Sequence, residues 1–99
     1  MKEGVIILLQ ARPEEFDELS ALVAAMTAQV RAYPGNLQAE VLLARDRNEI
    51  SVFQQWESAE ALSDYLIWRS GQEDFERVHD LAAAEPDFRT YTIPLQDQP

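Results

Sequence analysis

The order of the predicted strands and helices is the feature of this sequence that most constrains its fold. Residues 5–9 form a continuous apolar run that includes β-branched side chains, which indicates a short strand covered on both faces. Elsewhere apolar residues recur every three or four positions, as in helices, or every second position, as in strands. The predicted order is a strand at 5–9, a helix at 16–33, strands at 37–43 and 50–56, helices after Ser58 and Ser70, and a strand at 88–93.

This order divides into two halves that share a strand–helix–strand plan. The plan is typical of the ferredoxin-like split βαβ arrangement, an α+β fold whose four-stranded antiparallel sheet has its first and third strands at the centre. The handedness of the crossovers then places the helices on one face of the sheet. We therefore expect a single domain over residues 1–99, with its core at about 4–94 and a frayed polar tail at 95–99.

Two helix starts carry capping signals. Ser58, followed by Glu60 in the first turn, predicts an N-cap in which the serine hydroxyl accepts a hydrogen bond from a backbone N–H. The run Ser70-Gly71-Gln72-Glu73 has the spacing of a reciprocal capping box, so Ser70 is expected to open the next helix. In that helix Phe75 and Val78 are expected to face the core.

The uncovered face of the predicted sheet has a consequence for assembly. A monomer with helices on one face needs polar residues on the other, yet the strand at 5–9 is apolar on both faces, and Leu42 and Phe53 stand among the polar residues of their strands. An exposed apolar patch of this kind usually marks an interface. We expect a homodimer in which two copies pack sheet against sheet about a two-fold axis. In the alternative, a monomer covers this face with its tail or a helix.

Charge and composition narrow the range of partners. Eighteen acidic residues against eight basic ones give a net charge of −10, which repels phosphate backbones and anionic lipid, so we expect neither nucleic acid nor a membrane as a partner. The chain has no cysteine and a single histidine, so we expect no metal site. No apolar run reaches the roughly 20 residues of a membrane-spanning helix, and the N-terminus lacks a signal-peptide pattern. We expect a cytoplasmic protein.

Two segments resemble the antibiotic biosynthesis monooxygenase family of dimeric α+β barrels. They are Pro34-Gly35-Asn36-Leu37 and Val52–Leu62, which reads Val-Phe-Gln-Gln-Trp-Glu-Ser-Ala-Glu-Ala-Leu. The step from Trp56 to Glu57, followed by small residues at a helix start, carries most of the likeness, which covers about residues 4–94. The resemblance implies the ferredoxin-like fold and the sheet-to-sheet dimer. Family members include cofactor-free oxygenases of phenols and quinols, haem-degrading enzymes and isomerases, so the fold alone does not fix the reaction.

The resemblance also implies places for site residues. In the family, the tryptophan at the position of Trp56 lies near a pocket between sheet and helices. The position of Tyr65 carries histidine in many members and a second tryptophan in the haem-degrading branch, so here a tyrosine hydroxyl stands in place of a base. Residues 75–79 resemble the segment that holds the iron-binding histidine of the haem-degrading branch, which corresponds to His79. That match requires about four inserted residues, and the asparagine of that branch's first strand is absent here.

Each candidate side chain also has a purely structural interpretation. A tryptophan such as Trp56 offers an apolar wall to an aromatic ligand, but large aromatics mostly fill cores. His79 could act as a base or a haem ligand, or pack beside Phe75 on the helix flank. Tyr65 could hold a phenol oxygen or reach the surface with its hydroxyl. Gln54, an amide in an apolar row, needs hydrogen-bond partners and indicates a wet pocket. We predict His79 and Tyr65 as catalytic residues and Trp56, Gln54, Phe75 and Trp68 as substrate-binding residues.

Three hypotheses for function follow. The first, implied by the resemblance, is a monooxygenase of a small aromatic or quinol-like molecule that needs no bound cofactor, because the substrate's own phenolate supplies the electron to dioxygen. The second is a non-catalytic dimeric module that binds a small ligand or serves in a stress response. The third is a protein that binds or degrades haem.

Overall fold

The structure, a computed structural model, describes residues 1–94, so the predicted tail at 95–99 lies outside the described residues. These residues form a four-stranded antiparallel sheet in the order β2-β3-β1-β4. The strands are β1 (Lys2–Gln10), β2 (Asn36–Ala44), β3 (Glu49–Trp56) and β4 (Asp87–Ile93); the helices are α1 (Phe16–Val30), α2 (Ala59–Ser70) and α3 (Glu73–Leu81), with a 3₁₀ turn, η1 (Arg45–Arg47). The ferredoxin-like prediction, with the first and third strands at the centre, is confirmed.

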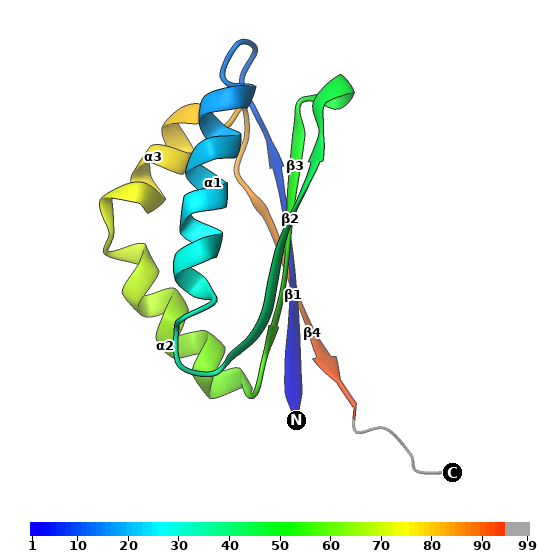
Figure 1. Ribbon diagram of the computed structural model, residues 1–99, viewed down its shortest axis with the longest axis vertical. Coiled ribbons are helices and arrows are strands. Elements are labelled where there is room, and N and C mark those ends of the chain that lie inside the picture. Colours follow the sequence, from blue (N-terminus) through cyan, green and yellow to red (C-terminus); the bar gives the residue numbers. More distant parts are fainter. Residues whose placement is uncertain (95–99) are drawn as a thin grey trace.

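All three helices lie on one face of the sheet, which Figure 1 shows edge-on. Alternation along the central strands decides which side chains meet them. In β1 and β3, Val5 lies opposite Gln54 and Leu9 lies opposite Ile50, and all four are buried under the helices. The alternate side chains of each strand, such as Ile6, point to the other face, against which no further element of residues 1–94 is packed.

Helix α1 shows how sequence and close packing set the boundaries of an element. Its buried residues follow the predicted stripe: Phe16, Leu19, Val23, Thr27 and Val30. The helix ends at Val30, earlier than predicted, and the chain turns at Gly35, which has a φ of +91°. A Cβ at Gly35 would lie 2.5 Å from the Cβ of Ala61, so only glycine fits both the backbone conformation and the space.

One of the two predicted caps is confirmed and the other is wrong. The Ser58 hydroxyl accepts a hydrogen bond from the backbone N–H of Ala61 at 3.1 Å and caps α2. Ser70 does not open α3; it is the last residue of α2, and its hydroxyl donates to the carbonyl of Ile67 at 2.9 Å. The N-cap of α3 is Gln72, which makes no side-chain capping bond. The chain therefore turns at Gly71, and Ser70 bonds back into the helix that it ends.

Two clusters of buried side chains form the core between the sheet and the helices. The aliphatic cluster, which lies under α1 and α3, consists of Leu9, Ala11, Phe16, Leu19, Val23, Ile50, Val52, Val78 and Leu81. The aromatic cluster, which lies under α2 and the end of α1, consists of Val5, Val30, Ala39, Trp56, Leu62 and Tyr65. Ile7 of β1 packs against both clusters and marks the junction between them.

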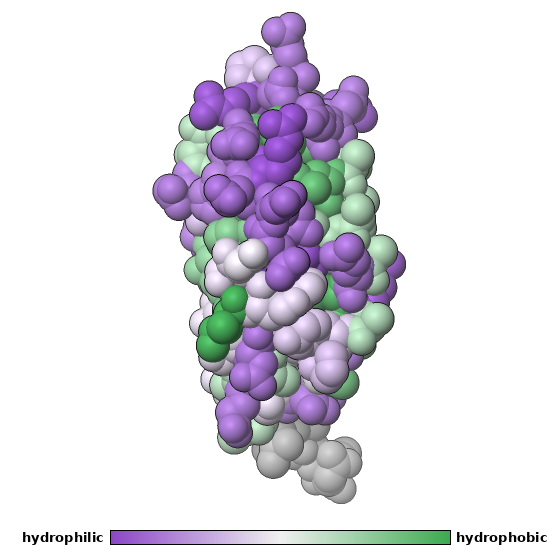
Figure 2. Space-filling view, turned by 90° about the vertical axis from the view of Figure 1, so that its left-hand side faces the viewer, coloured by the Kyte–Doolittle hydropathy of each residue, from purple (hydrophilic) through white to green (hydrophobic). Residues whose placement is uncertain are grey.

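The two surfaces of the molecule differ in character. The helix side is strongly hydrophilic in its upper half, where α3 lies, as the purple residues of Figure 2 show. The first turn of α3 alone carries Glu73, Asp74 and Glu76, which contribute to this hydrophilic surface. The opposite sheet face carries apolar side chains instead, including Leu42 and Tyr91, which are 60% and 48% exposed.

Candidate functional site

A cavity of about 400 Å³ lies between the helices and the sheet, at the junction of the two core clusters. Its size falls within the usual range for small-molecule sites. Most of its wall is aliphatic or aromatic, with a few polar groups, which is the composition of pockets that bind apolar ligands. The lining residues that carry polar groups or aromatic rings are Thr27, Gln54, Tyr65, Arg69, Ser70, Phe75, His79, Glu85 and Phe88.

Gln54 brings an amide into the cavity from the middle of the sheet. It lies on the helix-covered face of β3 and is buried, in a row with Val52 and Trp56. The indole Nε1 of Trp56 donates a hydrogen bond to the Gln54 Oε1 at 3.0 Å. Because an indole N–H can only donate, this bond fixes the amide oxygen toward Trp56 and leaves the amide nitrogen to face elsewhere.

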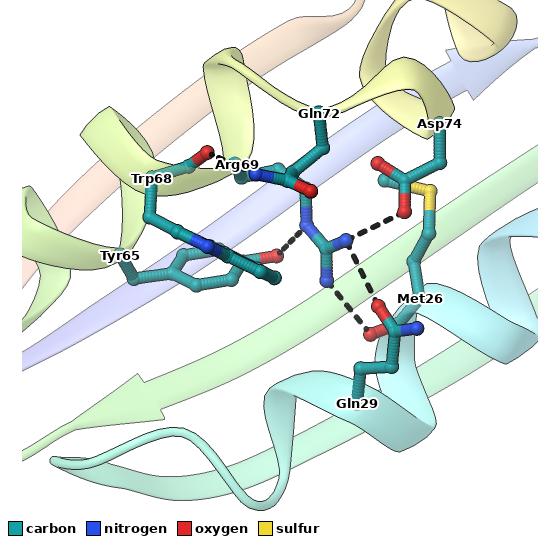
Figure 3. Close-up of polar contacts among 7 residues, drawn as sticks. All are labelled: Met26, Gln29, Tyr65, Trp68, Arg69, Gln72 and Asp74. Atoms are coloured by element: carbon teal, nitrogen blue, oxygen red, sulfur yellow. Dashed lines mark hydrogen bonds and ion pairs between the residues drawn. The ribbon is translucent and has the colours of Figure 1, made fainter.

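Tyr65 and Arg69 form a buried polar pair on α2, one helical turn apart (Figure 3). The Arg69 Nε donates to the Tyr65 hydroxyl at 3.0 Å. Its Nη1 donates to the Gln29 Oε1 at 3.0 Å and to the Asp74 Oδ2 at 2.7 Å, and its Nη2 donates to the carbonyl of Met26 at 3.3 Å. Arg69 therefore joins α2 to α1 and α3, although it is only 2% exposed.

The protonation state of Tyr65 follows from this setting. Burial raises the pKa of the Tyr65 hydroxyl above its ordinary value of 10.0, because the phenolate would lose its hydration. The hydrogen bond and the charge of Arg69 oppose this rise. Since the net direction is upward, Tyr65 stays neutral at physiological pH and can donate a hydrogen bond rather than act as a base.

His79 approaches the cavity from α3 and has a defined tautomer. Its Nδ1 lies 3.0 Å from the carbonyl oxygen of Phe75, and its ring packs edge-on against the Phe75 ring at a centroid distance of 5.0 Å. A carbonyl can only accept, so Nδ1 carries the proton and Nε2 of the neutral ring holds a lone pair. The Nε2 lies 3.8 Å from the carboxylate of Glu85, which is well exposed.

The structure gathers four of the six predicted site residues around this cavity: Gln54, Tyr65, Phe75 and His79. Phe75, predicted to face the core, is 37% exposed, because it stands at the cavity rather than under the sheet. Trp56 and Trp68 do not line the cavity. Trp56 is fully buried behind it, with its ring stacked on Tyr65 at 5.0 Å, whereas Trp68 is 40% exposed and packs on Arg69 at 4.8 Å.

Sequence reasoning missed Arg69, the most buried charged residue of the cavity wall. One signal could have found it: Arg69 lies four positions after Tyr65, so the two share a helix face. From the sequence alone, an arginine at the end of a helix is still expected to be solvated, because arginine is almost never fully buried unless it is paired. Its partner Asp74 belongs to the next helix.

Within residues 1–94, no group of three or more His, Asp or Glu side chains is placed to hold a metal ion. No helix in the same range has the length and apolar character needed to cross a membrane.

Comparison with known proteins places the chain in a family. The model of the family described as "Antibiotic biosynthesis monooxygenase" matches residues 4–80. Among solved structures, Rv0793 from Mycobacterium tuberculosis superposes with a TM-score of 0.78 at 22% identity, over 98% of both chains. A variant of SnoaB, a cofactor-independent oxygenase from Streptomyces nogalater, superposes with a TM-score of 0.80 at 14% identity, over 96% of this chain and 95% of that one.

A third structure, protein NE2512 of unknown function from Nitrosomonas europaea, superposes with a TM-score of 0.80 at 17% identity, over 99% of this chain and 94% of that one. No curated protein matches the sequence. The solved structures share the fold, and the family model covers well over half of the chain. The protein therefore belongs to the antibiotic biosynthesis monooxygenase family.

Proposed function

We propose that the protein is a monooxygenase that oxidises a small aromatic or quinol-like molecule without a bound cofactor. The observation that carries this proposal is the cavity of about 400 Å³, whose apolar wall also holds a tautomerically defined histidine and a neutral tyrosine. The family provides a precedent, since SnoaB is a cofactor-independent oxygenase with the same fold.

The wall of the cavity suits a flat apolar ring system. Val23, Val52 and Leu9 provide its aliphatic part, and Phe75 and Phe88 provide aromatic rings. Polar atoms are few, so a ligand that fills this space gains mainly from the burial of apolar surface, at about 25 cal/mol per Å². The polar groups then decide how the ring is oriented.

His79 is the residue best placed to start the reaction. Its Nε2 lone pair can accept the proton of a substrate hydroxyl, because Nδ1 is held protonated by the Phe75 carbonyl. The Tyr65 hydroxyl can hold a substrate oxygen by donating to it. The resulting phenolate is electron-rich enough to reduce dioxygen. In the overall reaction a ring C–H of the phenol becomes C=O, so that the phenol and O₂ give a quinone with one more oxygen atom, and the second oxygen atom leaves as water.

Oxygen uptake tests this function. With a hydroquinone or a hydroxylated polycycle as substrate, an oxygen electrode should record consumption that is catalytic in protein. We expect His79→Ala and Tyr65→Phe each to lower kcat by roughly 10²-fold, the lower range for loss of a general base or an oxyanion donor. Tyr33→Phe is the matched control, since Tyr33 packs on Tyr65 without lining the cavity. Binding of such molecules without any oxygen uptake would favour a non-catalytic binding module instead.

We further propose that the protein acts as a homodimer joined through the open sheet face. One row across this face reads Glu40, Phe53, Ile6 and Arg89, from β2 to β4. Apolar residues thus stand in the centre and charged ones at both edges, which is the arrangement of protein–protein interfaces. Leu42 lies in the neighbouring row and extends the apolar centre.

Sedimentation equilibrium tests the dimer. We expect twice the chain mass at micromolar concentration, and the mass of a single chain for Phe53→Glu, because a charge at the centre of the interface would be buried without a partner. Ile67→Glu, the same kind of change at an exposed position of α2 on the opposite side of the molecule, is the control and should remain dimeric. A single-chain mass for the unaltered protein would contradict the proposal.

A further inference from the structure

We infer that two buried polar groups of the cavity wall, the Tyr65 hydroxyl and the Gln54 amide, are both held as hydrogen-bond donors toward a ligand, and that Arg69 and Trp56 hold them in this state. The cavity would therefore select molecules that place a carbonyl or phenolate oxygen beside these groups. The inference deepens the proposed function, because it assigns positioning residues and a feature of the substrate to the same site.

The role of the Tyr65 hydroxyl toward a ligand depends on its neighbours, because a hydroxyl can donate or accept a hydrogen bond. Arg69 is a donor only, and its Nε–H occupies the Tyr65 oxygen at 3.0 Å. Within residues 1–94 the Tyr65 hydroxyl proton makes no hydrogen bond, and Tyr65 lines the cavity. The guanidinium therefore leaves the hydroxyl one role toward a ligand, which is to donate.

The guanidinium of Arg69 is held in this position by its other hydrogen bonds. Its Nη1 is bound to both Gln29 and Asp74, and its Nη2 is bound to the carbonyl of Met26. These bonds come from two other helices and fix the plane of the guanidinium, as Figure 3 shows. The orientation of the Tyr65 hydroxyl is thus set by a network that spans all three helices, and not by α2 alone.

On the sheet, the hydrogen-bonding role of Gln54 is likewise fixed by a neighbour that can only donate. Its amide could present either oxygen or nitrogen to the cavity. The indole N–H of Trp56 is a donor only and holds the amide oxygen at 3.0 Å. The amide nitrogen, which has no hydrogen-bond partner within residues 1–94, is left to donate. Trp56 is fully buried and does not line the cavity, so its part is to position Gln54.

A second property of this arrangement is its independence from pH near neutrality. Neither an amide nor a tyrosine with a raised pKa changes its charge there. His79 and Glu85, which also line the cavity, are more exposed and present acceptors, while the hydroxyls of Thr27 and Ser70 can serve either role. A complementary molecule therefore carries an oxygen acceptor at the buried end and a hydroxyl near His79.

Two probes of nearly equal shape test the inference. 1-Tetralone carries a carbonyl oxygen where tetralin carries a methylene, and calorimetry gives the ratio of their dissociation constants. We expect the protein to prefer 1-tetralone by about tenfold, the value for one or two net hydrogen bonds. Tyr65→Phe and Gln54→Leu should each lower this ratio by about threefold or more. The ratio is insensitive to a general loosening of the fold, because both probes use the same apolar wall.

The positioning role of Arg69 is tested by a double-mutant cycle. Arg69→Met should lower the ratio as much as Tyr65→Phe, and should lower it no further when Tyr65→Phe is already present. Arg77→Met, an exposed arginine of α3 paired with Glu18, is the matched control and should leave the ratio unchanged. If Arg69→Met alone does not fold, Arg69→Met combined with Asp74→Asn removes both charges and gives the same comparison.

Trp56→Phe tests in the same way whether Trp56 positions Gln54. It should lower the ratio of the dissociation constants, and it should lower that ratio no further when Gln54→Leu is already present. Equal affinity for the two probes, or no binding of either, would overturn the inference. So would a ratio that Arg69→Met leaves unchanged. Binding needs no oxygen, so a preserved preference without oxygen uptake would refute only the oxygenase proposal, whereas oxygen uptake with equal probe affinities would refute only the donor assignment.

Discussion

The aliphatic and aromatic clusters both join helices to the sheet, but they do so through different interactions. The aliphatic cluster, under α1 and α3, contains almost only hydrocarbon and depends on shape and burial. The aromatic cluster, under α2, is crossed by hydrogen bonds from Trp56 to Gln54 and from Arg69 to Tyr65. The cavity lies where the two clusters meet, with hydrocarbon on one side and oriented polar groups on the other.

This division explains how a small domain can keep an apolar cavity and still orient a ligand. Hydrocarbon packing is tolerant of small displacements and gives no direction, while hydrogen bonds to charged groups have strict geometry. Polar groups in a core cost free energy unless every partner is present. Gathering the Tyr65–Arg69 and Gln54–Trp56 pairs on one side of the cavity confines most of that cost to the border of the site.

The largest expected effect comes from breaking the polar cluster, by which we mean Arg69 and its hydrogen-bond partners Tyr65, Gln29, Asp74 and Met26. Arg69→Met removes four hydrogen bonds and leaves Asp74 and the Tyr65 hydroxyl without their cation. We expect a loss of about 3–5 kcal/mol in the free energy of unfolding, which is the usual cost of breaking a buried ion pair. Urea denaturation followed by circular dichroism measures it. Arg77→Met removes an exposed ion pair and should change little; equal effects of the two would show that burial of Arg69 does not matter.

The matching test in the aliphatic cluster is Leu19→Ala. Leu19 of α1 is fully buried, so the substitution leaves an apolar hole and should cost about 2–5 kcal/mol in the free energy of unfolding. Leu43→Ala, at an exposed position of β2, is the control. The contrast with Arg69 appears in ligand selectivity: Leu19→Ala should leave the preference between the two tetralin-type probes unchanged, since no hydrogen bond is lost. A changed preference would mean that the clusters are not separable.

The two clusters also differ in how far they could be predicted from the sequence. The aliphatic cluster and the sheet were predictable, because the strict alternation in β3 and the stripe of α1 each allow one buried face. Gln54 was predictable as well, since an amide in an apolar row must find a partner. Each of these inferences needs only residues that are neighbours along one element.

The polar cluster could not be predicted in the same way, because it joins residues of three helices. The spacing of four from Tyr65 is the one local signal for Arg69, and it does not indicate the contacts with Met26 and Gln29, which lie some forty positions earlier. The capping-box spacing at Ser70 failed for a related reason. Gly71 ends α2 and redirects the chain into α3, and this turn brings Asp74 onto Arg69.

A smaller effect is expected at the start of α2, the helix that covers the aromatic cluster. Ser58→Ala removes the hydroxyl that accepts from the Ala61 N–H and should cost about 1 kcal/mol. Ser63→Ala, at an exposed position inside the same helix, is the control and should be neutral or slightly stabilising. A loss at Ser63 as large as that at Ser58 would show that the measurement reports helix composition rather than capping.

The smallest expected effect is a pH dependence that belongs to the polar cluster alone. Because burial raises the pKa of Tyr65 above 10.0, the unfolded chain loses this proton before the folded protein does. The unfolded state then binds fewer protons, so the stability contributed by Tyr65 is fully present below pH 10 and declines as the pH rises through the folded-state pKa. We expect the difference in Tm between the unaltered protein and Tyr65→Phe to be constant from pH 8 to about pH 10. From there to pH 11, the Tm of the unaltered protein should fall relative to that of Tyr65→Phe. Tyr91→Phe, at an exposed position, should show no such change. A difference for Tyr65→Phe that does not depend on pH would mean that the hydroxyl ionises as easily beside Arg69 as it does in water.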